Sequence, residues 1–285
     1  MSRTSTPGCR LSVLMAGDHR SAVIFRRGPS RQVLMIRWWL KSDTFEIGQW
    51  LKGRVFVERS DLSHDGELLI YFAGNWRAPY ETWSAVSRPP YFTALALWPK
   101  GDTWGGGGRF ITERLIAIDH GQGQLALAEG MRLGKGFRVE ALDPVKHLAV
   151  LDQTRKLGWE CHRQGKYDFN AQAFVPPNVD RRRNPRQPAV LLEHWVKKYG
   201  PGRPGAEHSG ARVITSNEDV LRILDEPDFA DWGRPAPLVV RQAVPRADEA
   251  GAMRRSAGRG AREIADFTPL TFEPEEAPEW ARDWP

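Results

Sequence analysis

Short apolar runs separated by polar turns dominate the first half of the chain. Two of these turns, Gly17–Arg20 and His64–Gly66, contain the Gly and Asp residues that tight hairpins favour. Runs of this length, with a turn every ~8–12 residues, predict an all-β protein rather than alternating strands and helices. The strands expected in this half are Leu11–Met15, Ala22–Phe25, Val33–Leu40, Phe45–Leu51, Arg54–Glu58, Glu67–Ala73, Phe92–Trp98, Phe110–Asp119 and Phe137–Ala141.

The second half of the chain is less regular. Its expected strands are Val145–Leu151, Leu157–His162 and Val190–Lys198, the last with a two-residue apolar period. Weak helical patterns lie at Glu218–Leu224, where Asn217 is available as an N-cap, and at Ala277–Trp284. Segments rich in Gly, Pro, basic or small polar residues predict mobile loops at 176–188, 199–212 and 247–260. None of them marks a convincing boundary, so we expect a single β-rich domain over 1–285.

One pattern of residues occurs twice and bears on the fold. Asp61–Tyr71 consists of an acidic residue, an apolar residue, a turn and an apolar strand, and Asp228–Val240 has the same order. In such a corner the Asp side chain bonds turn amides and the Gly permits positive φ. A four-stranded propeller blade takes about 40–50 residues, so we predict a β-propeller-like fold of roughly five to six small blades. A β-sandwich or split barrel with two similar turns is the alternative.

Several stretches resemble a known group of sequences. They are Asp61–Phe72, Ser87–Pro99, Gly101–Gly108, Phe267–Glu273 and Ala277–Ala281, and they are similar to parts of uncharacterised bacterial proteins with WD40-like, propeller-type sequences. The resemblance covers most of the chain, so it implies one domain and favours the propeller. It implies no activity, because that group has no assigned function.

The composition of the chain bears on the cellular compartment in which we expect the protein. The chain has twelve Trp, which favours a β-rich core or binding surfaces, and only two Cys, Cys9 and Cys161, which form no disulfide framework. No apolar stretch approaches the ~18 residues of a membrane span, and Leu11–Ala16 is too short for the core of a signal peptide. We therefore expect a cytoplasmic protein with no membrane partner.

The charge is unevenly distributed along the chain. The net charge is +6, yet residues 263–285 carry seven acidic residues against Arg282 alone. A basic body with an acidic tail is consistent with a nucleic-acid partner or with a tail that packs on its own body. We favour packing, with a last strand at Phe267–Phe272, because Phe267, Phe272, Trp280 and Trp284 would be costly to leave in water.

The densest group of aromatic residues lies between Tyr71 and Phe110, with arginines between them. Arginine among aromatic side chains is typical of binding surfaces, and aromatic residues on loops bind more often than they pack. The loops of a propeller collect on one face, so we predict one binding surface from the loops of this region. The candidate binding residues are Trp76, Arg77, Tyr80, Arg88, Tyr91, Trp104 and Arg109.

Motifs for catalysis, cofactors and metals are not found in the sequence. Gly105–Gly108 precedes a strand instead of opening a helix, so we expect a tight turn rather than a phosphate loop. The seven His form no metal-binding pair, and no Gly-x-Ser-x-Gly elbow occurs, so the catalytic residues stay unknown and no metal or cofactor is expected. We predict a non-enzymatic protein-interaction module. The alternatives are a nucleic-acid-binding protein that uses basic loops such as Arg181–Arg186, and a hydrolase or lyase with a site in the propeller channel.

Overall fold

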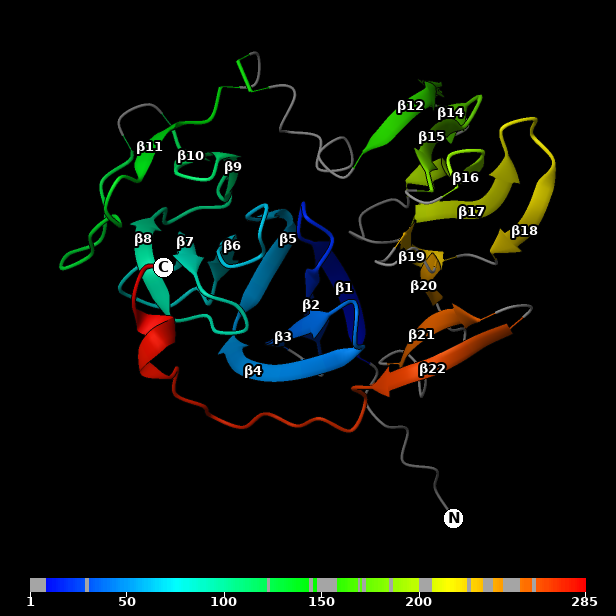
Figure 1. Cartoon of the computed structure of the whole chain (residues 1–285). Helices are drawn as coiled ribbons and strands as arrows, with labels where there is room; N and C mark the ends of the chain where they lie inside the picture. The colour runs from blue at the N-terminus through cyan, green and yellow to red at the C-terminus, as the bar shows by residue number, and fades with distance from the viewer. Residues whose placement is uncertain are drawn as a thin grey trace. The chain divides into compact units, whose positions relative to one another are not determined.

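The chain forms two compact units (Figure 1). The computed structural model describes residues 9–28, 31–121, 124–143, 146–147, 158–168, 170, 173–184, 187–199, 207–224, 227–232, 238–242, 252–257 and 260–285. Unit 1 comprises Met1–Gln153 and Phe267–Pro285, and unit 2 comprises Thr154–Asp266. Each unit is defined by the contacts among its own residues. The expectation of a single domain over 1–285 stays a prediction.

The regular structure of the described residues is β, apart from one 3-10 turn, η1 (Glu279–Arg282). This confirms the prediction of an all-β protein. The helix expected at Ala277–Trp284 is reduced to that single turn. The helix expected at Glu218–Leu224 is wrong, because β18 (Val220–Leu224) pairs with the preceding strand there.

Unit 1 contains three sheets that follow one another along the chain. Sheet A and sheet B are four-stranded antiparallel meanders, and sheet C has three strands, of which β10 and β11 are parallel. Sheet A is β1 (Arg10–Met15), β2 (Ser21–Arg27), β3 (Gln32–Trp39) and β4 (Thr44–Lys52); sheet B is β5 (Arg54–Leu62), β6 (Leu69–Gly74), β7 (Thr82–Ser87) and β8 (Ala94–Pro99); sheet C is β9 (Gly108–Thr112), β10 (Leu115–Ile118) and β11 (Arg138–Ala141).

Sheet B packs on both of its faces. Leu69, Tyr71 and Ala73 of β6 belong to one apolar core with residues of sheet A, whereas Ile70 belongs to a second core with residues of sheet C. Successive residues of a strand point to opposite faces, so a strand covered on both sides needs an uninterrupted apolar run. The run Leu68–Ala73 is therefore the signature of a central sheet.

The C-terminal segment 267–285 packs on unit 1, as expected, but it forms no strand at Phe267–Phe272. Ring contacts and hydrogen bonds hold it: the ring centres of Phe267 and Phe45 lie 5.2 Å apart edge-on, those of Trp284 and Phe137 lie 4.5 Å apart, and Arg26 donates to the carbonyls of Phe267 and Thr268. The indole nitrogen of Trp284 also donates to the carbonyl of Arg132 at 3.2 Å. The last strand was wrongly predicted because irregular backbone carries these aromatic anchors equally well.

Trp284→Ala is expected to lower the free energy of unfolding by about 1–2 kcal/mol, because it removes a ring contact and a hydrogen bond. Trp104→Ala is the matched control, since Trp104 is 88% exposed and loses little on truncation. Thermal unfolding of both variants checks this. Equal melting temperatures for the two variants would contradict the role given to the C-terminal segment.

Unit 2 contains the remaining strands. The five-stranded sheet D is an antiparallel meander with the hairpin of sheet E inserted after its first strand, and sheet F has four antiparallel strands. Sheet D is β12 (Trp159–Arg163), β15 (Asn178–Arg183), β16 (Val190–Tyr199), β17 (Glu207–Thr215) and β18; sheet E is β13 (Lys166–Asp168) and β14 (Ala173–Val175); sheet F is β19 (Pro227–Trp232), β20 (Leu238–Gln242), β21 (Ala252–Ala257) and β22 (Gly260–Asp266).

The three predicted loops are wrong in part. Strand β15 lies within 176–188, β17 begins within 199–212, and β21 lies within 247–260. The rest of 199–212 and 247–260 falls mainly outside the described residues, as does most of the strand predicted at Val145–Leu151. The basic run was taken for a loop because its cross-strand partner is distant in sequence.

That partner is Glu193, a buried carboxylate on the central strand β16. Arg181 of β15 and Arg212 of β17 lie directly opposite it on the two neighbouring strands, and their Nε atoms donate to its oxygens at 2.8 and 2.6 Å. Burial raises the pKa of Glu193, but the hydrogen bonds from Arg212 and Arg181 outweigh it and hold that pKa below its usual value.

Glu193→Gln is expected to cost about 2 kcal/mol near neutral pH, because it leaves two arginines without their shared carboxylate. The lowered pKa in the folded state means that the stabilisation is complete above the ordinary Glu pKa and is lost as the pH falls through the folded value. Denaturant unfolding from neutral to acid pH should therefore show the difference between wild type and variant shrinking at low pH. Glu113→Gln, at an exposed carboxylate in unit 1, serves as control, and a difference independent of pH would contradict the assignment.

Candidate functional site

One end of sheet B gathers the loops that carry most of the candidate residues. Gly74 pairs with Arg54 and with Thr82, and Trp83 pairs with Pro99, so the turn before β5, the β6–β7 loop and the β8–β9 connection share this end. We call it the loop end. Trp76, Arg77, Tyr80 and Trp104 lie on its loops.

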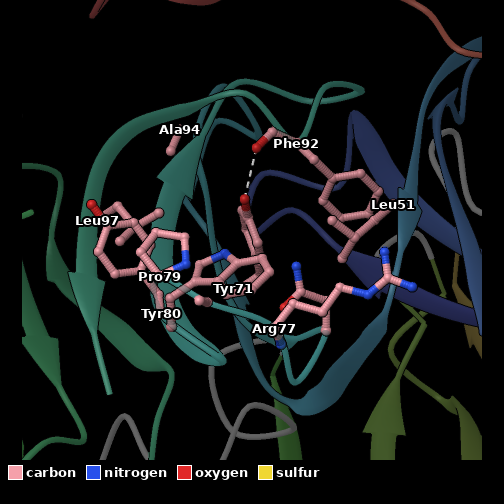
Figure 2. Close-up of a pocket in the computed structure, with 11 residues that line it drawn as sticks. Leu51, Tyr71, Arg77, Pro79, Tyr80, Phe92, Ala94 and Leu97 are labelled. Carbon is pink, nitrogen blue, oxygen red and sulfur yellow. Dashed lines mark hydrogen bonds between the residues drawn. The ribbon is translucent and has the colours of Figure 1, made fainter. Parts of the chain in front are cut away.

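A pocket of about 290 Å³ lies at the loop end. Figure 2 shows the rings of Tyr71, Tyr80 and Phe92 around it, with Arg77 beside them. The remaining walls are the residues Leu51, Asn75, Ala78, Pro79, Trp83, Ala94 and Leu97. Of the candidate residues, Arg77 and Tyr80 therefore line one pocket together.

The hydroxyl of Tyr71 fixes one wall of the pocket. It donates to the carbonyl of Phe92 at 2.7 Å, the dashed line in Figure 2. Burial raises the pKa of Tyr71, so the phenol stays protonated and remains a donor. The sequence placed Tyr71, Trp83 and Phe92 in the aromatic cluster but did not identify them as pocket walls, because their positions depend on pairing across three strands.

The β6–β7 loop is held by its own backbone. The amides of Asn75 and Trp76 both donate to the carbonyl of Glu81 at 3.0 Å, and the Asn75 side chain accepts from the amide of Arg77 at 2.9 Å. Trp76 remains 44% exposed, with the guanidinium of Arg31 5.5 Å from the centre of its ring. The fixed backbone of this loop thus carries the ring of Trp76 and the guanidinium of Arg77.

The β8–β9 connection is fixed beside this loop. Thr82, which follows the β6–β7 loop, donates its hydroxyl to the carbonyl of Asp102 at 2.6 Å, and Asp102 accepts the amide of Trp104 at 2.8 Å. Gly107 has a φ of 88° and passes so close to Arg59 that a Cβ would overlap the Arg59 carbonyl oxygen. The glycine tract is a tight turn against another backbone, as expected, and it holds an almost fully exposed Trp104.

The other three candidate residues lie elsewhere. Arg88 and Tyr91 follow β7 at the opposite end of sheet B, where both contact Trp280 of the C-terminal segment. Arg109 is buried and donates to the carbonyls of Glu58 and Gly108 at 3.0 and 2.8 Å. The predicted set is therefore divided between a pocket, a packing contact and a buried hydrogen-bond donor.

The side chains that line the pocket are mostly apolar and aromatic. Arg77 is the one ionised side chain among those that line it, and a guanidinium does not act as a base at neutral pH. Its walls include no His, Cys, Ser, Asp or Glu. No group of three or more His, Cys, Asp or Glu in the described residues is arranged to hold a metal ion.

One buried Ser–His pair was not foreseen. The Oγ of Ser84 lies 2.9 Å from Nε2 of His120, Nδ1 of His120 lies 3.1 Å from the carbonyl oxygen of Gln124, and Gly107 donates its amide to Ser84 at 2.7 Å. Burial lowers the pKa of His120, which keeps the imidazole neutral. Ser84 is fully buried, so the pair anchors the glycine turn and is not open to a substrate.

No family model matches the chain, and no curated protein shows significant similarity to it. Within the residues that the structure describes, no helix is long and apolar enough to cross a membrane. The geometry of the loop end is therefore the main evidence that bears on function.

Gly107→Ala is expected to destabilise the protein by about 3 kcal/mol, because the new methyl group overlaps the Arg59 carbonyl in addition to straining the backbone. Gly101→Ala is the control: its φ is 80°, but nothing lies within 4 Å of the added Cβ, so only the strain of about 1 kcal/mol remains. Unfolding free energies of the two variants test this. Equal losses would mean that the glycine turn is not packed as described.

Proposed function

We propose that the chain is a non-enzymatic protein-interaction module that binds its partner at the loop end. The observation that carries this proposal is the apolar pocket lined by Arg77, with the exposed rings of Trp76 and Trp104 on loops at the same end of sheet B. Aromatic side chains and arginine on fixed loops are the usual anchors of protein interfaces. The absence of His, Cys, Ser, Asp and Glu from the walls of the pocket supports binding in preference to hydrolysis.

We also propose that the fold is a WD40-like β-propeller of five or six small blades, a bacterial protein group by resemblance. Sheets A and B, and likewise sheets D and F, are meanders of four or five strands that follow one another along the chain, as blades do, with sheet C between the two pairs. In unit 1 the first strands of successive sheets contact one another, β1 with β5 and β5 with β9. The two similar sequence corners both lead from the first to the second strand of a four-stranded sheet.

A cytoplasmic location belongs to the same proposal. Cys9 and Cys161 are both free, and Cys161 is exposed. Free thiols of this kind suit a reducing compartment.

The double substitution Trp76→Ala with Arg77→Ala is expected to reduce recovery of the protein partner at least about tenfold, because it removes a ring and a cation that a partner would contact. The tagged full-length chain is recovered from its cells after nuclease treatment, and bound proteins are quantified by mass spectrometry. The matched control is Arg20→Ala with Trp39→Ala, an exposed Arg and a partly exposed Trp at the other end of sheet A.

Two results would contradict the proposal. One is a partner retained equally by both double variants, which would place its site elsewhere. The other is loss of all partners on nuclease treatment, which would favour nucleic-acid binding.

A further inference from the structure

Three arginines form a cluster where sheets A and B meet at the loop end. Arg10 and Arg27 lie directly opposite each other on β1 and β2, and Arg54 begins β5, which contacts β1. Burial and the charges of Arg54 and Arg10 lower the pKa of Arg27, with Glu58 acting in the opposite direction. Like charges on opposite residues are destabilising, so such a cluster needs an explanation.

The arginines of the loop end differ from those at the opposite end. There, Arg20 pairs with Asp18, and both Arg37 and Arg88 pair with Glu67. Within the described part of the chain, Arg10, Arg27, Arg31, Arg54 and Arg77 have no carboxylate within ion-pair distance. The Nε of Arg54 is buried without a hydrogen-bond partner, as are those of Arg37 and Arg88, and the guanidinium of Arg54 lies 4.3 Å from the centre of the Phe56 ring.

The cluster and the pocket are carried by neighbouring stretches of backbone. Gly53, next to Arg54, lies against the carbonyl of Gly74 and near the Cβ of Asn75, a pocket wall. Gly53 also donates its amide to the carbonyl of Arg31, whose guanidinium lies over Trp76. The loop end therefore carries both an apolar pocket and five arginines that lack a carboxylate partner among the described residues.

The C-terminal segment shows how this protein holds an acidic, aromatic peptide. The guanidinium of Arg88 lies 4.9 Å from the ring of Trp280, and the amine of Lys52 lies 4.3 Å from the ring of Phe272. Glu273, Glu275 and Glu279 between and beside these anchors are exposed. Rings and cations of unit 1 thus hold the aromatic side chains of this segment, while its carboxylates stay exposed.

Resting on the proposed function, we propose that the loop end binds an acidic segment of a partner protein that carries an apolar anchor. The anchor occupies the pocket, and the carboxylates pair with Arg10, Arg27 and Arg54, with Arg31 and Arg77 beside them. Leu51, Pro79, Ala94 and Leu97 give the pocket aliphatic walls, which suit an apolar side chain better than the polar edges of a nucleobase. The observations therefore favour a peptide over a nucleic acid.

A random peptide library displayed on phage, selected against the immobilised full-length protein, tests the proposal without knowledge of the partner. Selected peptides should be rich in Asp and Glu around one aromatic or aliphatic residue. Their binding should weaken in Trp76→Ala with Arg77→Ala, and it should fall as salt is raised, because exposed ion pairs are screened.

The charge variant is Arg10→Gln, Arg27→Gln and Arg54→Gln together, and the control removes the same charge at the exposed residues Arg20, Arg132 and Arg138. We expect the first variant to bind the selected peptides about tenfold more weakly and the control to bind them unchanged, as three lost ion pairs of a few tenths to one kcal/mol each imply. Melting temperatures confirm folding, and Arg10→Gln alone, at an exposed residue, replaces the triple variant if that variant unfolds.

The possible results distinguish failure of this inference from failure of the proposed function. The selected peptides could depend on Trp76 and Arg77, lack acidic residues, and bind the charge variant as tightly as the wild type. That result would overturn this inference and leave the proposed function standing. If no selected peptide depends on Trp76 and Arg77 for binding, the proposed function itself is overturned. A single-stranded oligonucleotide that binds more tightly than any peptide, and is lost in the charge variant, would assign the cluster to nucleic acid.

Discussion

The burial of sheet B on both faces is the constraint on which unit 1 depends. Because Leu69 and Tyr71 enter one core and Ile70 enters another, Tyr71 is the one side chain of β6 that lines the pocket. The strand ends and their loops supply most of the other side chains that a ligand could reach. The two ends of the sheets are therefore the main accessible parts of this unit. Their side chains differ in how far they are paired within the chain.

At one end, arginines pair with a carboxylate of the chain and hold a ring of its C-terminal segment. Glu67 pairs with Arg37 and Arg88, while Tyr91 and Arg88 hold Trp280. At the loop end the backbone is equally well fixed, yet Trp104 is exposed and the arginines have no carboxylate partner among the described residues. Fixed loops with unsatisfied side chains are what a binding surface requires, since little ordering entropy is lost on association.

The sequence predicted the strands where apolar runs were long, and it missed those whose signal depends on partners. Strand β7 (Thr82–Ser87) is short and half polar, and Ser84 is buried only because His120 and Gly107 bond its hydroxyl. Arg181 belongs to a strand because Glu193 lies opposite it. The site was found as a region but not as a pocket, since Arg77 and Tyr80 face it while Arg109, equally suggestive in sequence, is buried under β5. Such differences are set by register, which a single sequence does not reveal.

The placement of the acidic tail decides how the charge of the chain should be understood. If the tail neutralised the basic body, its carboxylates would pair with body arginines. Among the described residues, the one ion pair of the tail is internal, between Arg282 and Glu276, and rings and backbone carbonyls make its contacts with the body. The acids of the tail stay exposed, and the arginines of the loop end keep their charge. Within the described part of the chain, the tail therefore does not neutralise the basic body through ion pairs.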